Sequence, residues 1–212
     1  MRESTGQLAT SITKRAELDY LLYLPEEQAG PPALLLFLHG AGERGCDLSL
    51  VKKHGPPLLI ERGRDLPFVV VAPQCPAHQW WESDSLAALL DDLLESHDVD
   101  QHRLYVTGLS MGGSGTWALA NACLGRFAAI APVCGPCTFV NPQRFKDTAV
   151  WCFHGAMDDA VPVSDSVQMV KRLREGGVDV RFTVYPDAGH DSWTQAYDGT
   201  DLYDWLLNHR RP

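Results

Sequence analysis

A serine between two glycines is the residue best suited to covalent chemistry in this sequence. Residues 108–112 read Gly-Leu-Ser-Met-Gly, between a predicted strand and a predicted helix. A serine on such a tight turn takes an unfavourable backbone conformation, and the flanking glycines leave room for it. The turn lifts the Ser110 hydroxyl clear of the sheet and puts the N–H of Met111 at a helix N-terminus, where negative charge is favoured. The pattern predicts Ser110 as a nucleophile.

A serine hydroxyl is a weak nucleophile, and it needs a base and an acid that orients the base. In a fold of alternating strands and helices, the acid and then a histidine follow the serine along the chain. His190 stands on a glycine-containing loop after the strand predicted over residues 180–185, and we expect it to be the base. His209 also comes late, but it falls in a predicted C-terminal helix.

The acid is expected after the strand predicted over residues 149–153, where two aspartates occur, Asp158 and Asp159. One could face the histidine while the other caps the helix that begins near Pro162. Spacing alone does not choose between them.

A glycine-rich segment after an early strand could supply a further backbone donor. Residues 39–45 read His-Gly-Ala-Gly-Glu-Arg-Gly. An oxyanion hole needs a second N–H besides that of Met111, usually from such a loop. The amide of Ala41 is the predicted donor.

These residues must be positioned by a regular alternation of elements. Runs that are apolar on both faces predict strands buried in a parallel sheet, over residues 34–38, 68–72, 104–107, 128–133, 149–153 and 180–185. Helices are predicted between them, on a leucine stripe over residues 86–94 and over residues 111–124, 163–174 and 200–208. Two N-terminal pieces, residues 7–13 and 18–24, could pair as antiparallel strands. The prediction is one α/β domain over residues 1–212, with three layers and a mostly parallel central sheet.

Composition limits the function classes. The chain has 212 residues and a formal charge of −9, which disfavours binding to nucleic acid or an anionic membrane surface. The six cysteines are scattered and no secretory signal is visible, so we expect reduced thiols and a cytoplasmic protein. The oligomeric state is not readable.

Four residues are candidates for contact with a substrate. Trp80, Trp81 and Trp193 could form cleft walls, although each could equally be a packing residue. Arg44 could meet an anionic substrate group, with a surface or structural ion pair as the alternative.

One motif points to a different class of protein. Residues 134–137 read Cys-Gly-Pro-Cys, the thioredoxin redox motif, which makes a thiol–disulfide oxidoreductase through Cys134 and Cys137 the alternative function. No second Cys/His element has a spacing suited to structural zinc, so neither a metal nor a cofactor is expected.

As a set, the motifs resemble the α/β-hydrolase superfamily, and within it the small cap-less carboxylesterases and phospholipase/carboxylesterase-like enzymes. The resemblance is closest to esterases and predicted peptidases related to polyhydroxybutyrate depolymerase and dienelactone hydrolase. It extends over residues 34–205 and is carried by residues 39–45, 72–76, 108–113, 154–162 and 189–193.

The resemblance implies roles for particular residues. The family pattern His-Gly-x-x-Asp-x-x-Val-Pro aligns the acid with Asp158, and the similarity also implies Ala41 and Met111 as oxyanion donors. The implied reaction is ester hydrolysis through an acyl-enzyme, with thioesterase, lysophospholipase or peptidase activity as the alternatives. Dienelactone hydrolases proper use cysteine as nucleophile, whereas this chain has Ser110.

The resemblance also bears on the substrate. Caps in this superfamily are inserted after the strand that corresponds to residues 128–133, and only residues 134–147 precede the next strand. This is too short for a helical lid, so we expect an open cleft and small soluble or exposed esters.

Overall fold

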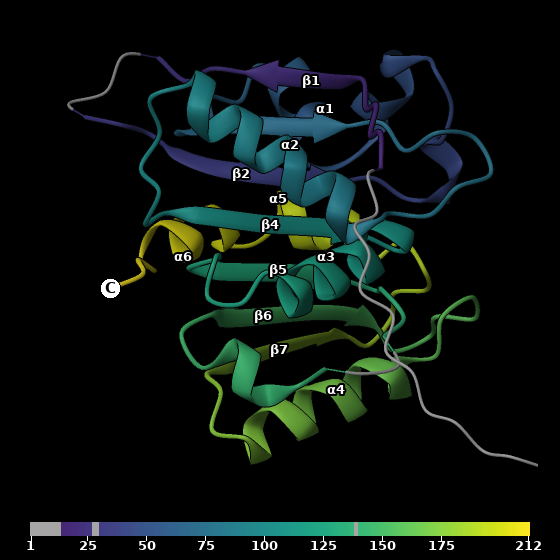
Figure 1. Ribbon diagram of the computed structural model, residues 1–212. Helices are drawn as coiled ribbons and strands as arrows, with labels where there is room; N and C mark the ends of the chain where they lie inside the picture. Colours follow the sequence, from purple (N-terminus) through teal and green to yellow (C-terminus); the bar gives the residue numbers. More distant parts are fainter. Residues whose placement is uncertain (1–13, 27–29, 138–139) are drawn as a thin grey trace, which may run out of the picture.

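The computed structural model describes residues 14–26, 30–137 and 140–212. Seven strands form one sheet in the order β1-β3-β2-β4-β5-β6-β7 (Figure 1). Their bounds are β1 Tyr20–Tyr23, β2 Ala33–Leu38, β3 Phe68–Pro73, β4 Leu104–Leu109, β5 Ala129–Val133, β6 Ala149–Gly155 and β7 Val180–Tyr185. Strand β1 pairs antiparallel with β3, and the other neighbours pair parallel. The carboxyl ends of the six parallel strands therefore meet at one edge of the sheet.

Helices cover both faces of the sheet. Their bounds are α1 Gly55–Glu61, α2 Ser83–Ser96, α3 Met111–Ala122, α4 Val163–Glu175, α5 Trp193–Asp198 and α6 Leu202–Leu207. Helices α2, α3 and α4 lie in front of the sheet in Figure 1, while α5 and α6 lie behind it. In the described part of the chain, no helix has both the length and the apolar character needed to cross a membrane.

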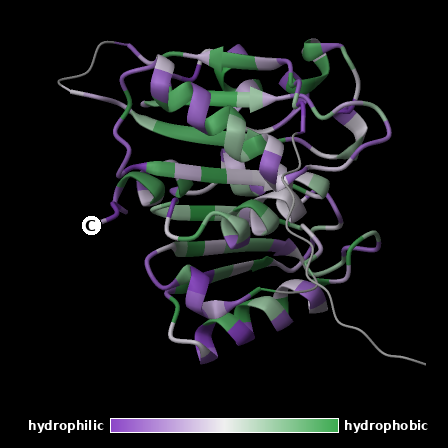
Figure 2. Cartoon of the chain, viewed as in Figure 1, coloured by the Kyte–Doolittle hydropathy of each residue, from purple (hydrophilic) through white to green (hydrophobic). Residues whose placement is uncertain are grey.

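The strands separate two apolar cores because successive side chains of a strand point to opposite faces. In β2, Leu34 and Leu36 join the core that contains residues of α2, α3 and α4. Leu35 and Phe37 join the other core, which contains residues of α1, α5 and α6. Every residue of β2 is buried, and the interior strands are mostly hydrophobic (Figure 2). Burial on both faces explains why these strands have continuous apolar sequences.

The fold class predicted from the sequence is confirmed, and the six parallel strands lie close to the predicted positions. Of the two N-terminal pieces, residues 18–24 contain β1, while residues 7–13 lie outside the described residues. Helix α1 was not predicted, because its start, Gly-Pro-Pro, is typical of a turn. The structure places a proline at the first helical positions, where no amide hydrogen bond is lost.

No cap domain follows β5 in the described residues. The connection from β5 to β6 contains one short 3-10 helix, Pro142–Phe145. The sheet edge that carries the predicted site residues is therefore not covered by an inserted helical domain.

Candidate active site

Ser110 forms the turn from β4 into α3 in a strained backbone conformation. Its φ is 52° and its ψ is −117°, a region that residues other than glycine rarely occupy. The Ser110 N–H donates to the carbonyl oxygen of Val133 at 2.9 Å, and its own carbonyl oxygen accepts from the Ser114 N–H at 3.0 Å. These bonds tie the strained residue to β5 on one side and to α3 on the other.

Two glycines let this turn lie against the end of β2. A Cβ atom on Gly112 would lie 1.9 Å from the carbonyl oxygen of Leu38, and one on Gly108 would lie 2.4 Å from the carbonyl oxygen of Gly112. Both obstacles are backbone atoms, which cannot rotate away. The glycines around Ser110 are therefore required for close packing.

We expect Gly112→Ala to lower the free energy of unfolding by about 1–3 kcal/mol, because the added methyl group overpacks the turn against β2. Gly42→Ala is the matched control, since a Cβ atom at Gly42 would meet nothing within 4 Å. Urea denaturation of both variants measures the difference. Equal stability of the two would contradict the close packing of the turn.

The structure brings Ser110, His190 and Asp158 together from the ends of three strands. The Nε2 atom of His190 lies 2.9 Å from the Oγ atom of Ser110, and its Nδ1 atom lies 2.8 Å from an Asp158 oxygen, Oδ2. A carboxylate only accepts, so Nδ1 carries the proton and Nε2 presents its lone pair to the serine hydroxyl. This is the arrangement that a serine nucleophile and its base require.

Asp158, rather than Asp159, faces the histidine. The side chain of Asp158 is fully buried, and its Oδ1 atom accepts from the N–H groups of Ala160 at 3.0 Å and Val161 at 2.8 Å. Burial favours the protonated acid, but hydrogen bonds from His190 and from these amides outweigh it, so the pKa of Asp158 lies below its ordinary value. Asp159 is exposed.

A buried histidine, His154, supports the loop that carries Asp158. The sequence did not indicate this role. The Nε2 atom of His154 lies 2.9 Å from the carbonyl oxygen of Val161 and 3.2 Å from Oδ2 of Asp158. Because a carbonyl only accepts, Nε2 is the donor, and Nδ1 accepts from Ser166 Oγ at 2.7 Å. His154 lies within the motif that aligns Asp158, but nothing in its spacing indicated this support.

Two backbone amides next to the serine turn remain available for a ligand. Ala41 begins the 3-10 helix Ala41–Glu43, directly after β2. A Cβ atom on the preceding Gly40 would lie 2.8 Å from Leu109, so this loop contacts the strand that carries Ser110. Among the described residues, neither the Ala41 nor the Met111 N–H has a hydrogen-bond acceptor. Both N–H groups are therefore free to donate to a ligand, as the predicted oxyanion donors must be.

The Ala41 loop is anchored by Arg44. Its Nε atom donates to the carbonyl oxygen of Ala41 at 2.9 Å, and its NH1 group donates to that of Gln79 at 3.2 Å. Both bonds go to backbone atoms of the protein. The structure therefore shows Arg44 as a bridge between two loops, through hydrogen bonds that are neither the predicted contact with a substrate anion nor the ion pair given as its alternative.

His39, at the end of β2, ties the same loop to the segment after β3. Its Nδ1 donates to the carbonyl oxygen of Gly40 at 2.7 Å, and its Nε2 accepts from the Cys75 N–H at 2.9 Å. The ring is buried, and burial lowers the pKa of His39 from 6.5 to about 4. The imidazole is therefore neutral in the folded protein at neutral pH.

This shift predicts a loss of stability in acid. Unfolded His39 binds a proton below about pH 6.5, whereas folded His39 does so only near pH 4. The neutral ring therefore stabilises the fold fully above pH 6.5, and up to about 3 kcal/mol is lost as the pH falls towards 4. In His39→Gln, an uncharged side chain replaces the ring, and urea denaturation between pH 7 and 4 should show a flatter profile. An unchanged profile would place the titration elsewhere.

The three tryptophans that are candidates for cleft walls lie in different environments. The Trp193 ring packs edge-on against His190, with centroids 5.4 Å apart, so it lies beside the predicted base. Trp80 is 60% exposed, whereas Trp81 is buried and donates its indole N–H to the carbonyl oxygen of His39 at 3.1 Å. Trp81 is therefore a packing residue that supports the loop after β2.

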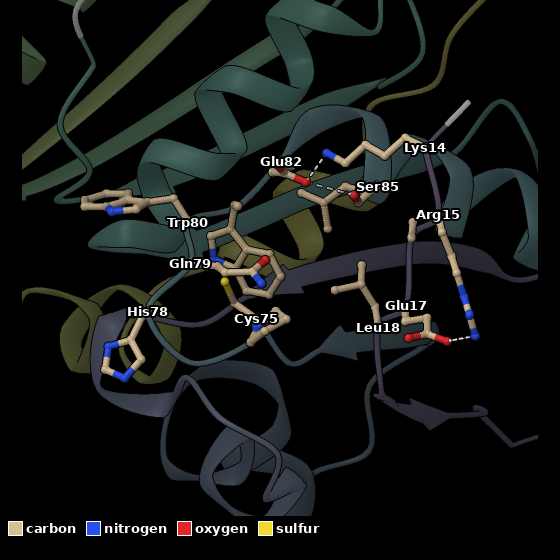
Figure 3. A pocket seen from close by; sticks show the side chains of 14 residues that line it. Lys14, Arg15, Glu17, Leu18, Cys75, His78, Gln79, Trp80, Glu82 and Ser85 are labelled. Carbon is tan, nitrogen blue, oxygen red and sulfur yellow. Dashed lines mark hydrogen bonds and ion pairs between the residues drawn. The ribbon is translucent and has the colours of Figure 1, made fainter. Parts of the chain in front are cut away.

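The cavity in Figure 3, about 690 Å³, lies beside Trp81 and the segment after β3. It is lined by residues 14–18, by the segment after β3 that contains Trp80 and Trp81, and by the start of α2. Trp80 lies at the end far from Lys14 (Figure 3). Neither Ser110 nor His190 lines this space.

The Cys-Gly-Pro-Cys segment does not have the properties of a redox site. Cys134 is a buried free thiol at the end of β5, and burial raises its pKa to about 12. A redox-active thiol needs a lowered pKa. This argues against the oxidoreductase alternative.

A mostly parallel sheet with helices on both faces, carrying a serine on the strained turn after β4, defines the α/β-hydrolase class. A comparison with protein families matches the dienelactone hydrolase family over residues 79–201, more than half of the chain. The chain belongs to the dienelactone hydrolase family.

Two relatives and one solved structure illustrate the similarity. A bifunctional acetylxylan esterase/xylanase of Neocallimastix patriciarum is 26% identical over 74% of this chain and 24% of its own length. A poly(3-hydroxyoctanoate) depolymerase of Pseudomonas fluorescens is 28% identical over 71% of this chain and 63% of its own length. The crystal structure of a thermostable esterase matches with a TM-score of 0.79 and 32% identity, over 92% of this chain and 60% of that one. The chain thus spans less than two thirds of the length of each.

Proposed function

We propose that this protein is a serine hydrolase that cleaves carboxylic esters through an acyl-enzyme. The observation that carries the proposal is the continuous hydrogen-bond chain from Ser110 through His190 to Asp158. A histidine held by a carboxylate and aimed at a serine hydroxyl has the geometry of nucleophilic acyl transfer.

The proposed reaction has two halves. In the first, Nε2 of His190 takes the hydroxyl proton as Oγ of Ser110 bonds to the ester carbonyl carbon. The oxygen that becomes negative accepts from the amides of Ala41 and Met111, and His190 returns the proton to the departing alcohol. In the second half, water gives a proton to His190 and attacks the acyl group, and the acid leaves as Ser110 regains its proton.

The environment of Asp158 suits the charge changes in this cycle. Its lowered pKa keeps the carboxylate ionised at neutral pH, so a negative charge lies beside His190 when the imidazole becomes cationic. His154 and two backbone amides hold this carboxylate in place. The site is thus preorganised for a transient imidazolium.

The relatives support an ester substrate. Two are named for enzymes that cleave esters, an acetylxylan esterase and a poly(3-hydroxyoctanoate) depolymerase. The alcohol parts of these substrates differ widely, so the shared feature is the carbonyl chemistry. In the described residues no cap covers the site, which favours small soluble esters or exposed ester groups.

The proposal is tested by p-nitrophenyl acetate hydrolysis together with covalent labelling. An organophosphate that phosphorylates serine hydrolases should inactivate the protein with one adduct per chain, and peptide mass spectrometry should place the adduct on Ser110. A panel of thioesters and peptides separates the alternatives. Labelling of another residue, or hydrolysis that survives full labelling, would overturn the proposal.

The absence of a cap predicts how the enzyme treats lipids. We expect the rate with a short-chain triglyceride to rise smoothly through the concentration at which droplets form. A sharp increase at that concentration would indicate a lid that opens at interfaces, and would contradict the open-cleft expectation.

A further inference from the structure

A thiol that takes no part in the proposed reaction lies near the proposed acid and base. One ligand atom each from Cys134, Asp158 and His190, a sulfur, a carboxylate oxygen and a ring nitrogen, lie within 4.8 Å of one another. The three residues follow the neighbouring strands β5, β6 and β7. The topology of the sheet therefore brings together a donor set that no local spacing in the sequence reveals.

We propose that Cys134, Asp158 and His190 form a binding site for a thiophilic divalent cation, Zn²⁺ or Cd²⁺, and that the bound cation inhibits the enzyme. The inhibitory consequence rests on the proposed function, whereas the binding does not. The sequence predicted no metal because no second Cys/His element has suitable spacing. Spacing along the sequence does not detect a site whose ligands follow three different strands.

The donor set matches the coordination chemistry of zinc. Zn²⁺ binds thiolate sulfur, imidazole nitrogen and carboxylate oxygen at about 2.0–2.3 Å, which places the ligands of a tetrahedral ion roughly 3.3–3.8 Å apart. The three atoms already lie within 4.8 Å of one another, so shifts of about 1 Å bring them into range. A water molecule would complete four-coordination. Mg²⁺ prefers oxygen ligands, so this set discriminates against it.

The surroundings hold the thiol in place. Cys134 has a φ of 40°, and its N–H donates to the carbonyl oxygen of Phe153 at 2.9 Å, which fixes the residue on β6. The side chains of Cys134 and Asp158 are buried, while His190 keeps a quarter of its side chain exposed. The cation therefore enters beside the imidazole.

Cation binding displaces protons and changes no oxidation state. Burial raises the pKa of the Cys134 thiol, so the free thiol is protonated, and the cation displaces this proton to solvent as the metal–sulfur bond forms. Neutral His190 donates one nitrogen lone pair. If Nδ1 binds, its proton moves to Nε2, and the hydrogen bond to Asp158 is lost together with the lone pair that faces Ser110. If Nε2 binds, the lone pair that faces Ser110 is occupied. Either outcome removes the base.

Spectroscopy with Co²⁺ tests the binding independently of activity. The wild-type protein should show a thiolate-to-Co²⁺ charge-transfer band that saturates at one ion per chain and is displaced by Zn²⁺. Cys134→Ala should lose the band, and Cys134→Ser serves the same purpose if the alanine variant fails to fold. The control, Cys46→Ala, removes an exposed thiol and should keep the band. A band that persists without the Cys134 thiol, or its absence in the wild type, overturns the site.

Inhibition tests the consequence. Each variant is compared with its own metal-free rate on p-nitrophenyl acetate. Removal of the Cys134 thiol should raise the Zn²⁺ concentration for half-inhibition at least ~10-fold, since even the loss of an outer-shell partner costs that much affinity. Mg²⁺ should not inhibit. Equal Zn²⁺ sensitivity of Cys134→Ala and wild type would overturn the link between binding and inhibition. A Co²⁺ band in a protein without esterase activity would instead refute only the proposed function.

Discussion

Ser110→Ala is expected to reduce kcat for p-nitrophenyl acetate by about 10⁴-fold or more, because the attacking oxygen is lost and only binding and the oxyanion amides remain. The alanine has the same backbone, so the turn between β4 and α3 should persist. Thermal unfolding and circular dichroism would show that the variant is folded. Single-turnover and steady-state rates measure the effect.

Ser114→Ala is the matched control, since Ser114 lies one turn further along the same helix and its N–H donates to the Ser110 carbonyl through the backbone alone. It should retain activity close to that of the wild type. If Ser110→Ala retained the wild-type rate, or if the two variants lost activity equally, Ser110 would not be the nucleophile.

Asp158→Asn is expected to lower kcat by about 10⁴-fold, the size of loss that a wrong histidine tautomer causes in this type of site. The Oδ1 position of Asp158 accepts from the amides of Ala160 and Val161, and this fixes which atom of an asparagine takes each place. The new NH₂ group would stand at Oδ2 and donate to Nδ1 of His190. The ring proton would then lie on Nε2, and no lone pair would face the serine.

Asp159→Asn is the control, because Asp159 is the exposed neighbour of Asp158 and undergoes the same loss of charge. Its effect on kcat should be small. The pH dependence of kcat/KM for each variant separates a loss of the base from a loss of substrate binding. A larger effect at Asp159 than at Asp158 would show that the histidine has a different partner.

The sequence predicted the fold well because burial on both faces leaves a clear pattern. Strand β2 is entirely apolar, and its neighbours differ from it little. Helix α1 was missed because its prolines occupy positions where a helix tolerates them, and α5 because six residues carry too little periodicity. Short elements depend on tertiary contacts, which a linear pattern does not show.

The predicted site residues differ in how far the sequence could define them. Ser110 and His190 stand beside glycines after apolar runs, so their local context is informative. From the residues alone, the choice between Asp158 and Asp159 depends on which side chain the loop turns towards His190 and the amides of Ala160 and Val161, a property of loop geometry. The buried position of Trp81 follows from packing under the β2 loop and has no signature in the sequence.

Two residues that lie close to Asp158 were not predicted as its neighbours. His154 lies in β6, the strand that precedes Asp158, and Cys134 directly follows the neighbouring strand β5. The Cys134 contact depends on the order of strands β5 and β6, which follows from topology. His154 is only four residues from Asp158, and its contact depends on the conformation of the loop between them.

The bridge that Arg44 forms between Ala41 and Gln79 has a consequence for engineering this enzyme. Gln79 precedes Trp80, an exposed side chain and a natural choice for randomisation in a search for new substrate preferences. The guanidinium links that loop to the carbonyl oxygen of Ala41, whose N–H is one of the two proposed oxyanion donors. Libraries at residues 78–80 should therefore change turnover together with selectivity. A library that varies Trp80 alone, with Arg44 and Gln79 unchanged, should separate the effect on selectivity from the effect on turnover.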